Sequence, residues 1–214
     1  MPSDRFKHLR SAVSELRRLL LPKHFDPAGQ YKYQDRVRAR SISFQILCHA
    51  EFESYFEDRA IDIASSALHY SNSNGKINHT GAHLLAFSGV EASLPPASLS
   101  PHHKKRGWRG MTNASDRLKD ATNIFVRYAQ DENHGIKEKN LSRLLLPIGL
   151  EPGQIDSTLV SELNSYGSSR GGYAHSSTTK HAQVAINPQD ELKRVRRILS
   201  LLIPLDAELS KLLV

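Results

Sequence analysis

Two side chains suited to phosphodiester chemistry stand close together in the polar segment 168–177. Arg170 and His175 lie five positions apart, and Gly171 and Gly172 follow the arginine. Arginine is permanently charged and binds phosphate through paired hydrogen bonds, and histidine exchanges a proton near neutral pH. Residues five apart on a straight helix point about 140° away from each other. The pair therefore converges only if the glycines let the backbone bend, or if a second subunit supplies its own copy. The alternative is a solvated arginine and a structural histidine.

A second candidate is the basic segment 102–109. It holds four cationic side chains, two histidines and a tryptophan, with no acid among them. Cations of this kind contact nucleic-acid phosphates, and an indole ring stacks on bases. The residues predicted to bind RNA are Lys104, Lys105, Arg106, Trp108 and Arg109. A loop that only increases solubility is the alternative.

The composition favours one domain with an anionic partner. The chain has 214 residues and a formal net charge of +7, which predicts a single domain over residues 1–214 and makes nucleic acid the expected partner. No apolar run reaches about eighteen residues, and charges are spread over the start of the chain, so we expect neither a membrane span nor a secretory signal and predict a cytoplasmic protein. The single cysteine, Cys48, falls in an apolar stripe and is predicted to be a core residue.

The elements that must position these residues are predicted to be helices. Apolar residues recur at spacings of three and four in several segments, which is typical of amphipathic helices. These segments are 3–21, 35–68, 113–133, 155–163 and 188–203. Pro204 is expected to kink or end the last helix. The pattern predicts an all-α bundle of five to six helices, with an irregular insertion at about 69–111 between core helices.

Two further positions could carry chemistry. Glu51 falls on the apolar stripe of segment 35–68, where a carboxylate usually has a partner. A structural salt bridge is the favoured interpretation, and orientation of Arg170 is the alternative. His79 and His83 have the spacing of a helical metal pair, but Gly81 lies between them and no third ligand is near, so no metal site is predicted.

Against this all-α background, the segment from Arg170 to His175 resembles the Arg-x(4-6)-His signature of the HEPN superfamily, helical domains many of which are RNases of bacterial defence and toxin systems. The segment from Arg40 to Tyr55 is similar to the long second helix of the RiboL-PSP-type HEPN families. The resemblance covers about 35–68 and 113–202. Many members carry a polar residue directly after the arginine, where this chain has Gly171.

The resemblance implies that two protomers pair so that both copies of Arg170 and His175 line one cleft, where RNA is cut without a metal or another cofactor. His175 would act as general base on the ribose 2′-hydroxyl or as general acid on the leaving 5′-oxygen, and Arg170 would neutralise the scissile phosphate. The products would be a 2′,3′-cyclic phosphate and a 5′-hydroxyl. Tyr173 would stack on a base or bind the phosphate, with packing between helices as its alternative role.

The sequence therefore supports the hypothesis of a homodimeric endoribonuclease of a toxin or defence type, with RNA as substrate and an antitoxin or defence-system protein as a further partner. One alternative is a catalytically inactive HEPN-like module that binds RNA or a partner protein. Another is a purely structural helical subunit, which leaves the net charge and the motif unexplained.

Overall fold

The computed structural model describes residues 1–89, 114–174 and 186–213, and of residues 170–174 it describes the backbone only. Within these ranges the chain forms helices and no strand, which confirms the all-α prediction. The α-helices are α1 (Asp4–Leu20), α2 (Gln34–Asn74), α3 (His79–Phe87), α5 (Ala114–Arg127), α6 (Glu138–Leu145), α7 (Ser157–Ala174) and α9 (Pro188–Lys211). A π-helix, η2 (Tyr128–Glu132), continues α5, and a 3₁₀ helix, η3 (Pro152–Gln154), precedes α7.

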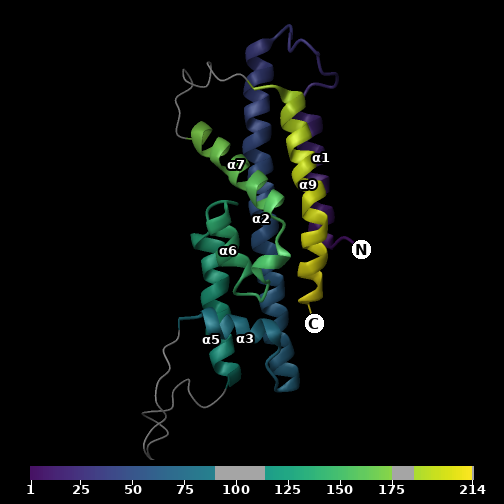
Figure 1. Ribbon diagram of the computed structural model, residues 1–214. Helices are drawn as coiled ribbons and strands as arrows, with labels where there is room; N and C mark the ends of the chain where they lie inside the picture. Colours follow the sequence, from purple (N-terminus) through teal and green to yellow (C-terminus); the bar gives the residue numbers. More distant parts are fainter. Residues whose placement is uncertain (90–113, 175–185, 214) are drawn as a thin grey trace, which may run out of the picture.

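Helix α2 is the axis of the molecule. Its 41 residues give a rod about 60 Å long at 1.5 Å per residue, and Figure 1 shows it running through the whole bundle. Helices α1 and α7 lie along its upper part in that view, α9 runs beside it from the upper part to below its middle, and α3, α5 and α6 lie around its lower part. Helix α2 ends at Gly75, whose left-handed backbone (φ 65°) lets its N–H reach the Ser71 carbonyl.

The predicted apolar stripe of α2 is buried except at one edge. Phe44, Cys48 and Phe52 are completely inaccessible, so the core role predicted for Cys48 is confirmed. Leu47, which the periodicity placed on the same stripe, is 43% exposed. Positions 44, 48 and 52 repeat every four residues and define a buried line, and Leu47 lies about 100° away from Cys48 around the helix. Ser41, Gln45 and His49, outside the predicted stripe, are buried as well, so the buried face is rotated away from Leu47 and is not narrower than the sequence pattern suggested.

The region expected to be an irregular insertion is more regular where it is described. Helix α2 continues to Asn74, and α3 begins at the cap Asn78, whose side chain accepts a hydrogen bond from the Gly81 N–H at 2.9 Å. Leu84 of α3 is 2% exposed and belongs to the core. A helix of nine residues with one strongly buried leucine shows little hydrophobic periodicity. The sequence pattern therefore did not predict the full length of α3. Residues 90–111 of the expected insertion lie outside the described residues.

Helix α9 continues through Pro204 to Lys211, whereas the sequence predicted a kink or an end there. A proline inside a helix costs about 3 kcal/mol because it removes a hydrogen bond and clashes with the preceding turn. Leu202, Leu205 and Leu209 are all buried on the two sides of the proline. Their burial offsets that cost, since each buried leucine contributes about 1.5–3 kcal/mol.

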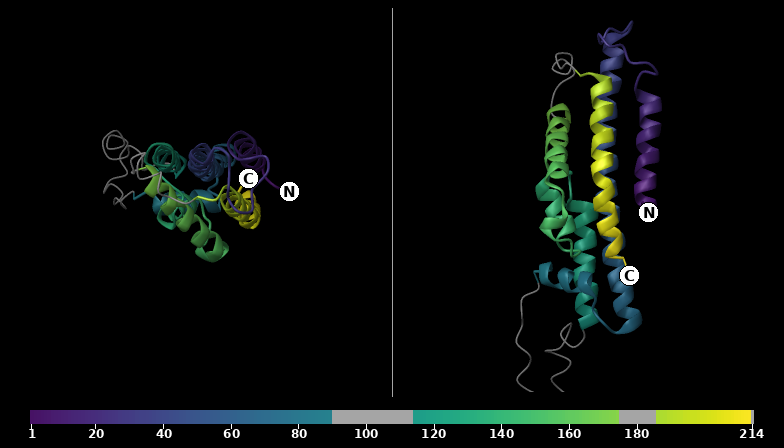
Figure 2. Two further views of the ribbon diagram at one scale, coloured as in Figure 1. Left: turned by 90° about the horizontal axis from the view of Figure 1, so that it is seen from above. Right: turned by 45° about the vertical axis from the view of Figure 1, so that its right-hand side comes forward.

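A buried polar network joins α1, α2 and α9, which lie side by side in Figure 2. The Asp206 carboxylate of α9 accepts hydrogen bonds from the N–H of Ser3 at 2.7 Å, the hydroxyl of Ser3 at 2.5 Å and the hydroxyl of Tyr55 at 2.9 Å. Its Oδ1 also lies 3.5 Å from Nε of Arg59. Arg59 and Asp206 are 2% and 1% exposed. The Ser3 hydroxyl caps α1 as well, accepting from the Phe6 N–H.

We expect Asp206→Asn to lower the free energy of unfolding by about 3–5 kcal/mol, because it leaves the Arg59 guanidinium buried without its counter-charge. Urea unfolding followed by circular dichroism measures this. Glu208→Gln, which breaks only the surface pair with Lys211 on the same helix, should change stability by less than about 1 kcal/mol. Equal effects of the two substitutions would contradict the structural role given to Asp206.

Candidate functional site

The motif singled out by the sequence lies in the last turns of α7. Arg170 and Tyr173 belong to this helix, which continues through Gly171 and Gly172 to Ala174. A bend at the glycines, one of the two ways in which Arg170 and His175 could converge, is therefore absent up to residue 174. The helix was also predicted to end near residue 163, before the motif. His175 and the basic residues Lys104, Lys105, Arg106, Trp108 and Arg109 lie outside the described residues.

The serine-rich turn before the motif stays helical because its hydroxyls are satisfied inside the helix. The Ser168 hydroxyl donates to the Asn164 carbonyl at 2.9 Å, and the Ser169 hydroxyl donates to the Ser165 carbonyl at 3.0 Å. Serine is a weak helix former mainly because its hydroxyl competes for backbone groups. In α7 the hydroxyls bond to carbonyls one turn back, so this competition does not end the helix.

Tyr166 anchors this end of α7 on α2. Its ring is fully buried, and its hydroxyl donates to the backbone carbonyl of Gln45 at 3.1 Å. Phe52 meets the ring edge-on at 5.9 Å between centroids, and His49 lies nearly parallel to it at 6.4 Å. Burial raises the pKa of the Tyr166 hydroxyl well above its ordinary value, so this group remains a neutral hydrogen-bond donor. The backbone that carries Arg170 is thus fixed one turn before the arginine.

Arg194 holds α9 against the same turn. Its guanidinium carbon lies 5.1 Å from the centroid of the Tyr166 ring, a favourable cation–π contact. Its two terminal nitrogens donate to the hydroxyls of Ser165 at 2.6 Å and Ser169 at 3.3 Å. In the sequence, Lys193, Arg194, Arg196 and Arg197 are most simply interpreted as a solvated face of the last helix, so Arg194 does not stand out. The partners of Arg194 are two serines four residues apart on α7. No pattern within α9 could have identified these partners, because they lie on another helix.

Two polar side chains near this anchor are buried without hydrogen-bond partners in the described structure. They are Gln45, through both amide atoms, and Glu191, through Oε2. Burial raises the pKa of Glu191, Asp190 adds to the rise, and Arg194 opposes it. The negative charge of Glu191 in turn contributes to the raised pKa of Cys48 and of Tyr166. An unsatisfied buried polar group costs about 1–3 kcal/mol, and such groups concentrate at functional sites.

Glu51 lies at the edge of the buried face of α2 and is partly exposed. It has no ion-pair partner among the residues that the structure describes, so the salt bridge favoured by the sequence is not found there. One turn earlier on the same edge lies the exposed Leu47, which explains why this carboxylate needs no buried counter-charge. Its contribution to the orientation of Arg170 stays a prediction.

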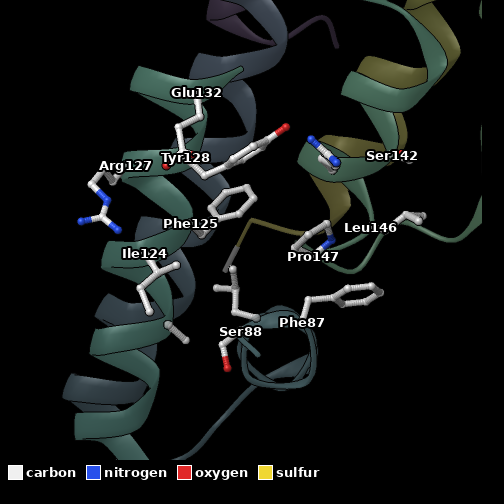
Figure 3. Close-up of a pocket in the computed structure, with 13 residues that line it drawn as sticks. Phe87, Ser88, Ile124, Phe125, Arg127, Tyr128, Glu132, Ser142, Leu146 and Pro147 are labelled. Carbon is white, nitrogen blue, oxygen red and sulfur yellow. The ribbon is translucent and has the colours of Figure 1, made fainter. Parts of the chain in front are cut away.

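A separate cavity of about 470 Å³ lies among α3, α5, η2 and α6 (Figure 3). Its wall is mainly apolar, and its rim carries the guanidinium groups of Arg127 and Arg143. Among the described residues that line it there is no histidine and one carboxylate, that of Glu132, so a general acid and base do not converge on this lining.

The two histidines with metal-pair spacing have structural partners. Nε2 of His79 donates to the Gly149 carbonyl at 3.0 Å, and the His83 ring lies 4.4 Å from that of His79 and stacks on Phe87. In the described part of the chain, no three His, Cys, Asp or Glu residues gather in a way that could hold a metal ion. None of the described helices is long and apolar enough to span a membrane.

We expect Glu191→Gln to stabilise the protein at neutral pH. The unfolded chain loses this proton near the ordinary carboxyl pKa of 4.5, and the folded chain keeps it to higher pH because the pKa is raised. Ionisation of Glu191 therefore lowers stability as the pH rises above about 4.5. Urea unfolding at pH 4 and pH 7.5 should show a gain at pH 7.5 only. Asp190→Asn, which changes an exposed carboxylate in the same turn, should give no such gain, and a gain of equal size at both pH values would refute the assignment.

The sequence was compared with family models, curated proteins and solved structures, and a family model matches it. No curated protein and no solved structure matches the chain. A family model described as RiboL-PSP-HEPN matches residues 8–211, which is nearly the whole sequence and includes α2, the α7 motif and α9. The chain therefore belongs to the RiboL-PSP-HEPN family.

Proposed function

We propose that this protein is a metal-independent endoribonuclease whose active centre is built around Arg170 and His175. The observation that carries the proposal is the anchored end of α7. The Tyr166 hydroxyl fixes this helix to α2, Arg194 fixes it to α9, and Arg170 follows directly on the same helix. Family membership over residues 8–211 supports the same function, because many HEPN domains are RNases.

The chemistry follows from the two residue types. The ribose 2′-oxygen attacks the adjacent phosphorus, the bond from phosphorus to the 5′-oxygen breaks, and a 2′,3′-cyclic phosphate and a 5′-hydroxyl result. The neutral imidazole of His175 from one protomer takes the proton from the 2′-hydroxyl. The protonated imidazole of His175 from the second protomer gives a proton to the leaving 5′-oxygen. Arg170 neutralises the charge that builds up on the phosphate oxygens. DNA lacks the 2′-hydroxyl and cannot react by this route.

A homodimeric centre is the arrangement that the backbone of α7 favours. Of the two ways in which Arg170 and His175 could converge, a bend at the glycines is opposed by the helical backbone of residues 171–174. Pairing with a second copy brings two arginines and two histidines to one cleft without a bend. It also supplies both the base and the acid that the reaction needs.

The wider assignments belong to the same proposal. We propose a single domain over residues 1–214, supported by one hydrophobic cluster to which α1, α2, α7 and α9 all contribute. Tyr173 and Glu51 are proposed to support the catalytic pair, and the segment Lys104–Arg109 to bind RNA. We also propose that the protein acts in a toxin or defence system and has an antitoxin or defence-system protein as its partner. This part of the proposal is supported by the family resemblance alone.

A catalytically inactive RNA-binding module is the second candidate. Gly171 favours it, because many members carry a polar residue directly after the motif arginine and this chain does not. The cationic side chains Lys193, Arg194 and Arg197 beside α7 would serve RNA binding equally well without turnover.

We expect the wild-type protein to cut single-stranded RNA in excess EDTA and to leave cyclic phosphate ends. His175→Ala should lower the cleavage rate by about 10²–10⁴-fold, the usual contribution of general acid–base catalysis, and Arg170→Ala should be similarly impaired. Gel analysis and end-group chemistry measure both effects. His134→Ala and Arg127→Ala, which remove exposed residues of the same two types, should cut at the wild-type rate.

Cleavage that needs a divalent metal, or that persists in His175→Ala, would refute the proposed mechanism. Binding of RNA without any cutting would favour the binding module. Sedimentation should give twice the mass of one chain for both the wild type and His175→Ala, and a purely monomeric active enzyme would exclude the shared cleft.

A further inference from the structure

A polar groove runs between α7 and α9, directly beside the motif. It has a volume of about 420 Å³ and is lined by Glu162, Ser165, Ser169, Lys193, Arg194 and Arg197. The motif arginine, Arg170, follows the lining residue Ser169 in the same helix. Its lining lies within residues 162–169 of α7 and 193–197 of α9, and Figure 1 shows the C-terminal end of α7 and the N-terminal end of α9 at the same end of the bundle.

The charge of the groove is positive and partly preorganised. Three cationic side chains and one carboxylate, that of Glu162, line the groove, so the lining carries two net positive charges. Outside the lining, the Asp190 carboxylate pairs with Lys193 at 3.1 Å. Arg194 is already ordered by the two serine hydroxyls and by the Tyr166 ring. A guanidinium has five N–H donors, so Arg194 keeps donors for a ligand after binding the serines.

The outer two cations are accessible. The side chain of Lys193 is 65% exposed and that of Arg197 is 61% exposed. The Arg197 Nε lies 3.0 Å from a carboxylate oxygen of Glu162, which is 22% exposed. Exposed ion pairs contribute at most about 1 kcal/mol to stability, so Arg197 can exchange this carboxylate for another anion at little cost.

We propose that this groove binds phosphates of the RNA strand that neighbour the scissile one. Ser169 lines the groove, and Arg170 follows it about 1.5 Å further along α7 and about 100° further around it. A strand whose scissile phosphate lies at Arg170 therefore reaches the groove by curving around α7, within a nucleotide or two. The path of the strand from Arg170 to the groove rests on the proposed ribonuclease function. The affinity of the groove for a phosphodiester chain does not depend on that function. Lys193 and Arg197 bind the backbone without reading sequence, and Glu162 weakens the binding.

The test uses full-length His175→Ala, which binds without cutting, and a short fluorescent single-stranded RNA in EDTA, with anisotropy measured over a range of salt concentrations. Adding Lys193→Ala and Arg197→Ala together should weaken binding on the order of tenfold. It should also lower the slope of log K against log salt by about 1.4, because each single-strand phosphate contact contributes about 0.7. The matched control adds Arg127→Ala and Arg143→Ala, which remove the same charge at the apolar cavity. It should leave both quantities unchanged.

Glu162→Gln tests the opposite direction. Removing the carboxylate raises the net charge of the groove and frees Arg197, so RNA should bind more tightly. Circular dichroism shows whether this variant keeps the wild-type fold, so that tighter binding can be assigned to the groove. A phosphate-backbone site predicts equal affinity for DNA of the same sequence, even though DNA is not cut.

The groove assignment fails if the control pair weakens binding as much as the groove pair, if Glu162→Gln does not strengthen binding, or if the protein binds vesicles of anionic lipid but not RNA. The ribonuclease proposal fails on a different result, the absence of His175-dependent cleavage by the wild type. If the protein binds RNA through the groove and does not cut it, the groove assignment stands and the ribonuclease proposal fails.

Discussion

The carboxylate of Asp206, buried against Arg59, fixes how α1, α2 and α9 lie against one another. Taking two charges out of water is expensive, and the cost is recovered only if the geometry and the remaining hydrogen bonds are satisfied. Here the serine that caps α1 and the hydroxyl of Tyr55 supply those bonds. A rotation or shift of any one helix would leave a buried charge without its partners. The network thus specifies a register that apolar packing alone would leave loosely defined.

The other end of α9 depends on that register. With its C-terminal half tied to α1 and α2, α9 presents its first turns to α7, where Arg194 meets Ser165, Ser169 and the ring of Tyr166. Tyr166 in turn bonds to α2 through the Gln45 carbonyl. Helix α7 is therefore held from two sides immediately before Arg170. A general consequence of such bracing is that a phosphate-binding arginine starts from a defined position and loses less conformational entropy on binding.

Buried polar atoms without hydrogen-bond partners lie in both neighbourhoods of the described structure: Arg59 Nε beside Asp206, and three atoms near Tyr166. Gln45 and Glu191 have buried polar atoms without hydrogen-bond partners, and burial raises the pKa of Glu191. Asp206 is more deeply buried but fully provided with donors, so it stabilises the fold. Glu191 opposes the fold when it is ionised. Proteins commonly accept such a cost where a site needs polar groups in a water-poor environment. The contrast is between a buried carboxylate that stabilises the fold and one that opposes it.

The sequence by itself determined the helical class, the central helix, the buried Cys48 and the polar motif at 170–175, because apolar spacing and residue type are local properties of the chain. It misplaced the ends of α2, α7 and α9. Serine, glycine and proline disfavour helices intrinsically, and only tertiary packing on both sides of Pro204 and internal bonds of Ser168 and Ser169 reveal that the helices continue. Local periodicity also could not predict the contacts of Arg194 with α7 or of Arg59 with Asp206. Both join residues that are distant in the sequence, and only the packed structure decides which charges are brought out of water together.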